Sequence, residues 1–310
     1  HCSVSIMNTP DAASFHILDR GTGERYNFVI SPSSHGKVAI RNFQASNTTM
    51  GNIMNTTLAY VLFAGVTAAG VIASAAVAEA ASGSVSITKS RGQICMVSNG
   101  LPNHATGKFP NSGNPHRIRA QHIEVCVPEN PKKTGRATML RGSTGFAING
   151  VMIRPGTADY YDASSRRGHS RNPASGWQLD GKGAGKMLGL DRNNAHVDQR
   201  GLYHYHAMPT AGLQGTSSLV GFAADGFELH YVGSRAKSGY SLKPGHRNGG
   251  PGGKHDGTYV QDWHYTGGSG RLDECNGGTL NGKFVYFVTD SYPYFPHCAW
   301  GKVSRAFNRP

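Results

Sequence analysis

Short apolar stretches separated by Gly, Pro and Asn-Gly turns are the recurring pattern over residues 82–310. Residues 84–87 alternate polar and apolar side chains, and residues 93–97 are mostly apolar, over lengths typical of β-strands. The best candidate for a helical turn or two is the segment 159–177. We expect further strands at 122–127, 146–148, 201–206, 227–232 and 283–289. The pattern predicts a mainly β fold, a single β-rich domain with long ordered loops and few short helices.

The composition agrees with this prediction. The chain has 310 residues, of which 42 are glycines and 15 are prolines, and only 16% are charged. A disordered chain normally carries more charge, and a coiled coil is far richer in Glu, Lys and Leu. The composition therefore favours a loop-rich globular protein.

A charge-free segment divides the chain. No charged residue occurs from 42 to 78, and residues 58–78 are apolar nearly throughout and long enough to cross a bilayer. The segment ends in small residues of the kind that signal peptidase accepts. We expect a signal peptide over 50–80, with a membrane anchor retained at 58–78 as the alternative. Residues 1–49 are then an upstream extension of doubtful status, and residues 81–310 are a secreted or periplasmic domain that contacts a membrane only through its signal segment.

Four cysteines lie in the expected mature region. An even number of cysteines in an exported chain predicts disulfides rather than free thiols. The pairs that are close in sequence, Cys95–Cys126 and Cys275–Cys298, are the preferred connectivity. A zinc site made by all four thiolates is the alternative, although the chain has no Cys-x-x-Cys spacing.

The formal net charge of the chain is +13. Such a charge favours polyanionic partners, an acidic glycan among them, through long-range attraction. The Lys and Arg residues occur as adjacent pairs at most, and the sequence has no Lys/Arg-rich stretch. This distribution indicates a diffusely basic surface. Nucleic acid is not an expected partner, because export separates the protein from it and no recognition motif is present.

Tyrosine and histidine alternate strictly over residues 203–206. Because alternate side chains on a β-strand share a face, His204 and His206 point to one side and Tyr203 and Tyr205 to the other. Two imidazoles on one face can bind a transition metal ion such as zinc, copper or iron. His196, eight residues before His204, is the expected third ligand. The tyrosines would pack behind the strand and fix the direction of the imidazoles.

Two other assignments remain open at this stage. The alternative for the His-x-His pair is a surface pair or a hydrogen-bonded structural pair, and His230 is a further candidate metal donor. The acidic residues Asp225, Asp273 and Glu274 are candidate catalytic groups, since each lies at a turn or beside a cysteine. The alternative for Asp225 and Asp273 is turn capping through side-chain hydrogen bonds.

Several motifs resemble the YHYH-domain family over about residues 90–302. The segment 191–196 followed by 201–209 is similar to the defining part of that family, and further similar pieces follow in order at 220–227, 272–277 and 288–298. Earlier pieces at 98–104 and 148–152 also fit. The resemblance implies an exported protein and no established reaction.

Two functions follow as hypotheses. The first is an exported protein with a histidine-based transition-metal site, which includes a metal-dependent enzyme that activates water. The alternative is a non-enzymatic binding module at the cell surface or in the periplasm. Its Tyr, Trp and His side chains would line a groove for a glycan, another polyanionic ligand or a small molecule.

Overall fold

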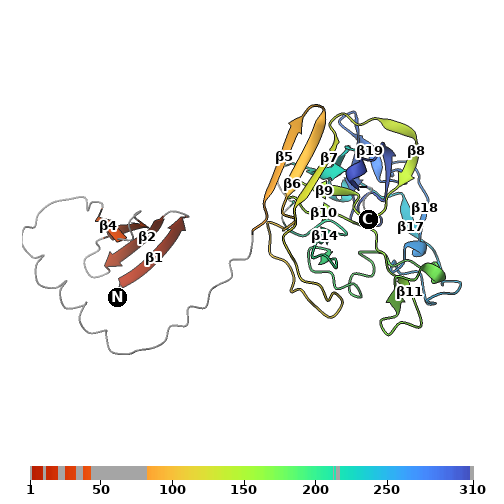
Figure 1. The fold of residues 1–310 in the computed structure, drawn as a ribbon, viewed down its shortest axis with the longest axis horizontal. Coiled ribbons are helices and arrows are strands. Elements are labelled where there is room, and N and C mark those ends of the chain that lie inside the picture. Colours follow the sequence, from red (N-terminus) through yellow and green to blue (C-terminus); the bar gives the residue numbers. More distant parts are fainter. Residues whose placement is uncertain are drawn as a thin grey trace, which may run out of the picture. The chain divides into compact units, whose positions relative to one another are not determined.

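The computed structural model describes residues 2–9, 12–19, 25–32, 38–42, 82–211, 213 and 217–307. The chain forms two units, His1–Ala76 and Val77–Pro310 (Figure 1). The first unit contains an antiparallel sheet whose strands follow one another in chain order: β1 (Cys2–Thr9), β2 (Ala12–Asp19), β3 (Arg25–Pro32) and β4 (Val38–Asn42).

The segment that we interpret as a signal peptide, 50–80, lies outside the described residues, as does the alternative anchor at 58–78. None of the helical segments that the structure describes has the length and apolar character that a bilayer crossing requires.

The second unit is mainly β, as predicted, and is organised around an eight-stranded mixed sheet. Its strands are, in order across the sheet, β13 (Ala195–Val197), β14 (Tyr203–Tyr205), β10 (Met152–Ile153), β9 (Gly145–Ala147), β15 (Leu219–Ala223), β16 (Glu228–Tyr231), β20 (Lys283–Val288) and β19 (Gly277–Leu280). Two neighbouring pairs, β10 with β14 and β16 with β20, are parallel, and the others are antiparallel.

Smaller sheets and turns surround this central sheet (Figure 1). A three-stranded antiparallel sheet is formed by β5 (Val85–Ser90), β6 (Gln93–Ser98) and β7 (Ile123–Pro128). Paired strands are β8 (Lys133–Met139) with β21 (Cys298–Gly301), β11 (Tyr160–Tyr161) with β12 (His169–Ser170), and β17 (Tyr240–Leu242) with β18 (Trp263–Tyr265). The described helices are 3-10 turns: η1 (Pro173–Ser175), η2 (Gly233–Arg235), η3 (Val260–Asp262) and η4 (Arg305–Phe307). The predicted helical region at 159–177 contains one of these turns, η1, between short strands.

Both predicted disulfides are confirmed, Cys95–Cys126 and Cys275–Cys298. The first joins directly opposed residues of β6 and β7. The second lies within the main core, where both cysteines are buried. The four thiolates are therefore not available for the alternative zinc site.

The two halves of the central sheet repeat one another. The sheet order reads the same from either edge when β9 is matched with β15, β10 with β16, β14 with β20 and β13 with β19. At the centre, Gly145-Phe146-Ala147 of β9 runs antiparallel to Gly221-Phe222-Ala223 of β15, and Phe146 lies opposite Phe222. Each tripeptide is followed by a turn with the same hydrogen bond, Gly150 N–H to Ala147 O and Gly226 N–H to Ala223 O.

The outer hairpins repeat as well. Ala195 lies opposite Tyr205 in one half, and Gly277 lies opposite Tyr286 in the other. The turns that lead into β13 and β19 each contain an asparagine with positive φ, Asn194 at 55° and Asn276 at 60°. The domain is thus built from two copies of one four-stranded arrangement, and matching positions in the two copies can be compared directly.

We predict that Gly145→Ala and Gly221→Ala destabilise the domain by similar amounts, about 2 kcal/mol or more each. A Cβ at Gly145 would lie 2.4 Å from the carbonyl oxygen of Phe222, and a Cβ at Gly221 would lie 2.3 Å from that of Phe146. Urea unfolding of each variant measures the change. The matched control is Gly135→Ala, where a Cβ meets nothing within 4 Å. Unfolding free energies for G145A and G221A equal to that of the control would contradict the close approach of β9 and β15.

Candidate metal centre

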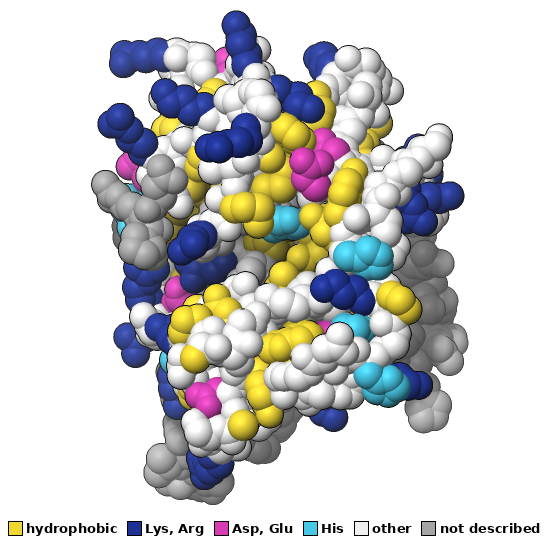
Figure 2. Space-filling view, turned by 90° about the vertical axis from the view of Figure 1, so that its right-hand side faces the viewer, with side chains coloured by type: hydrophobic (Ala, Val, Ile, Leu, Met, Phe, Trp, Pro, Cys, Tyr) yellow, Lys and Arg dark blue, Asp and Glu magenta, His cyan; other side chains and the backbone are white. Residues whose placement is uncertain are grey.

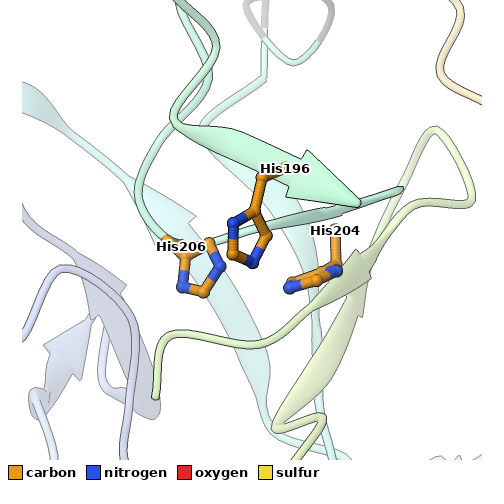
Figure 3. Close-up of side chains that lie close together, drawn as sticks. All are labelled: His196, His204 and His206. Carbon is orange, nitrogen blue, oxygen red and sulfur yellow. The ribbon is translucent and has the colours of Figure 1, made fainter. Parts of the chain in front are cut away.

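Three histidines from neighbouring strands form a compact cluster. His196 of β13 lies directly opposite His204 of β14, and His206 follows β14 on the same face (Figure 3). The ring centroids of the three imidazoles are 4.6–4.9 Å apart. One nitrogen from each ring lies within 4.8 Å of the other two. The structure therefore brings together the three histidines that the sequence singled out.

Backbone carbonyls set the tautomer of all three neutral rings. The Nδ1 atoms of His196, His204 and His206 lie 2.9 Å from Leu188 O, 3.0 Å from Leu202 O and 3.2 Å from Pro155 O, respectively. A carbonyl oxygen can only accept a hydrogen bond, so each Nδ1 carries the proton. The Nε2 atoms then keep their lone pairs, which is the form of histidine that binds a metal.

The cluster is buried and has an unpaired polar atom. His204 is 2% exposed and His206 is 1% exposed, while His196 is partly exposed. His206 Nε2 is buried and has no hydrogen-bond partner among the described residues. An unpaired buried nitrogen is unfavourable unless something binds to it. The site thus has a free electron pair directed into a confined space.

Burial lowers the pKa values of these imidazoles. The pKa of His204 and the pKa of His206 are held well below the usual value for histidine, first by desolvation and then by the charge that His196 would carry. Desolvation also lowers the pKa of His196. All three rings are therefore neutral at pH 7, as metal binding requires.

Tyr203 and Tyr205 lie on the opposite face of β14, in the main core, where both are fully buried. The hydroxyl of Tyr203 donates to Asp191 Oδ2 at 2.8 Å. The hydroxyl of Tyr205 accepts from Asn149 Nδ2 at 2.9 Å and lies 2.6 Å from His104 Nε2. These contacts fix the strand from behind and so determine where its histidines point.

The structure places the candidate acidic residues outside the cluster. Asp225 Oδ2 accepts hydrogen bonds from the Tyr286 hydroxyl at 2.7 Å and from Gly301 N–H at 2.8 Å. Asp273 Oδ2 accepts from Trp300 Nε1, and its Oδ1 accepts from the amides of its own turn. Among the described residues, the group of potential metal ligands contains the three histidines and no carboxylate.

Two further candidates also lie elsewhere. His230 on β16 has both ring nitrogens engaged, 2.9 Å from Ser218 Oγ and 2.9 Å from Glu228 Oε2. Glu274 is partly exposed in the turn before β19, and its backbone carbonyl accepts from the Tyr240 hydroxyl. Both residues belong to the other half of the sheet from the three histidines.

The matching positions in that other half show that the fold does not require histidine. The counterparts of His196, His204 and His206 are Gly278, Val285 and Phe287, as the strand registers show. Val285 and Phe287 pack with Leu272 in an apolar cluster. The same strand arrangement thus forms with apolar side chains, so the histidines are not explained by the needs of the sheet.

A cavity of about 920 Å³ opens onto the three histidines. Sequence reasoning did not identify several side chains that line it, among them Arg154, Asp198, His169 and His297. They come from separate segments with no shared motif. Only the pairing of β10 with β14 and the folding of the long loops place them beside the cluster. Burial lowers the pKa of His297 to about 4, so this side chain is also neutral at pH 7.

We predict that the metal-free protein loses stability as the pH falls below about 6.5, the value for an unfolded histidine. The folded pKa values are lower than this, so the unfolded chain binds more protons and the free energy of unfolding decreases, by up to about 1.4 kcal/mol per pH unit for each histidine. Urea unfolding between pH 5 and 7.5 measures the slope. The variant H204V/H206F, which carries the counterpart residues of the second half, should show a shallower slope. Equal slopes in the two proteins would contradict the neutral burial of these histidines.

Comparison with known proteins identifies the family to which the chain belongs. No curated protein and no solved structure was found to match the chain. The sequence model of the YHYH protein family matches residues 124–301, which include the central sheet, all three histidines and the Tyr203–His206 segment. The match covers more than half of the chain, and the chain therefore belongs to the YHYH protein family.

Proposed function

We propose that this protein binds one divalent transition metal ion, zinc, copper or iron, through the Nε2 atoms of His196, His204 and His206. The observation that carries the proposal is the orientation of the rings. Each Nδ1 is held by a backbone carbonyl, and the buried Nε2 of His206 has no hydrogen-bond partner within the described ranges. One nitrogen from each of the three rings lies within 4.8 Å of the other two, and histidine nitrogens are common zinc ligands.

The reaction class that fits this arrangement is metal-assisted hydrolysis. Three protein ligands and an open fourth position are the usual arrangement of a catalytic zinc site, whereas structural sites have four protein ligands. The cavity beside the histidines supplies room for a substrate. When bound there, a metal ion would act as a Lewis acid and lower the pKa of a bound water molecule.

Export to the periplasm or the cell exterior is part of the proposal. It is supported by the charge-free segment 42–78 and by the two disulfides, which persist in oxidising compartments. A non-enzymatic module that binds an acidic glycan is the second candidate. It is favoured by the net charge of +13 and by Lys and Arg side chains spread over one face of the domain (Figure 2).

We predict that the purified protein, after incubation with zinc and gel filtration, retains about one equivalent of metal. The H204V/H206F variant and the less disruptive His196→Gln variant should bind zinc about 100-fold more weakly or worse, because each removes at least one ligand. Elemental analysis and competition with a chelator measure this, and circular dichroism verifies the fold.

The matched control is His230→Gln, a buried histidine at the other half of the sheet, which should bind zinc as wild type does. Copper(II) and iron(II) are tested in the same way. If wild type retains none of the three metals above background, the histidines have no metal-binding role and the glycan-binding function takes precedence.

A further inference from the structure

Three neutral imidazoles leave the charge of a divalent ion uncompensated. No carboxylate belongs to the ligand group among the described residues. A bound dication would therefore keep about two positive charges at the end of a partly closed cavity, where charge interactions are stronger than in water. Such a site favours an anion in the remaining coordination position or next to it.

Arg154 lies beside the histidines on the same face of the sheet. In the parallel pairing of β10 and β14, Met152 lies opposite His204 and Ile153 opposite Tyr205. The amide of Arg154 donates to the carbonyl of Tyr205, which continues the pairing and brings Arg154 level with His206. The position is thus set by the sheet and not by a loop.

The guanidinium of Arg154 has donors to spare. Its Nη1 is 3.2 Å from Asp198 Oδ2, the only ion pair that it makes with the described residues. Its Nε is buried and has no hydrogen-bond partner in the part of the chain that the structure describes. The other oxygen of Asp198 accepts from the backbone amides of Arg200 and Leu202. Asp198 therefore orients Arg154 and leaves some of the N–H donors of its guanidinium group unused.

Further arginines line the cavity. They are Arg141, Arg167 and Arg171, in addition to Arg154. The acidic residues in the lining are Asp159, which contacts His169, and Asp198, which contacts Arg154 and Arg200. Arg141 and Arg167 make no ion pair with any residue that the structure describes. The positive charge that faces the cavity is thus larger than its own acidic residues can balance.

We infer that the substrate is a small molecule bearing an oxyanion, a carboxylate or a phosphate group, which binds to Arg154 beside the metal ion. This inference rests on the proposed metal site for the reaction, although the arginines are present without it. The planar guanidinium matches both oxyanions through paired hydrogen bonds. The cavity volume of about 920 Å³ suits a small molecule. Arg154 acts as a substrate-binding residue, and Arg141 and Arg167 add attraction at the rim.

The test is calorimetric titration of the zinc-loaded protein with inorganic phosphate in one arm and acetate in the other, compared with Arg154→Gln. We expect wild type to bind at least one of the two anions, and R154Q to bind it about 10-fold more weakly while retaining its zinc. The two arms show which oxyanion is preferred. The matched control is Arg136→Gln, an exposed arginine on β8 outside the cavity lining, which should bind the anion as wild type does.

The outcomes separate this inference from the metal proposal. If zinc binds but neither anion binds, or if R154Q and wild type bind the anion equally, the inference is wrong and the metal site stands. If zinc does not bind but the anion binds in a manner that depends on Arg154, the metal proposal fails alone. If R154Q fails to fold because Asp198 loses its contact with Arg154, the double variant R154Q/D198N removes both charges and gives the same comparison. Heparin binding that R154Q leaves unchanged, with no binding of either small anion, would instead support the glycan function and overturn the inference.

Discussion

The alternation of side chains along β14 is the constraint on which the site depends. Tyr203 and Tyr205 are anchored in the core by hydrogen bonds to Asp191 and Asn149, so the residues between and after them must point to the other face. A shift of one residue in register would place the histidines in the core and the tyrosines in the cavity. The direction of the imidazoles is therefore fixed by buried contacts on the opposite side of the sheet.

The second constraint is the set of backbone carbonyls that accept hydrogen bonds from the Nδ1–H groups. They come from Leu188, Leu202 and Pro155, in three separate segments. Because backbone oxygens cannot change their protonation, the tautomer of each ring is the same whatever the pH near neutrality. The three rings are therefore held in place by the backbone alone.

Much of the fold and part of the site were predictable from local sequence. The mainly β fold class follows from short apolar stretches and frequent turns. The disulfide pairing follows from cysteines that are close in the chain. The shared face of His204 and His206 follows from the two-residue period of a strand. These features all depend on neighbours in sequence.

The features that escaped prediction depend on distant segments. Arg154 enters the site through a parallel pairing of β10 with β14, and no residue pattern near position 154 indicates that partner. Asp225 and Asp273 were plausible catalytic groups, but the structure engages them with Tyr286 and Trp300. The repeat of the two halves is not evident in the sequence because few residues match between them, mainly Gly-Phe-Ala and the turn that follows it.

The register at the centre of the sheet has a consequence for the ancestry of the domain. When a strand pairs antiparallel with its own copy about a central residue, the two copies are related by a two-fold axis, as in an isologous dimer. β9 and β15 have this arrangement, centred on Phe146 and Phe222. Fusion of two identical half-domains that once associated through this strand would produce such a sheet. In the present chain the two halves differ at the matching positions, where one carries His196, His204 and His206 and the other carries Gly278, Val285 and Phe287.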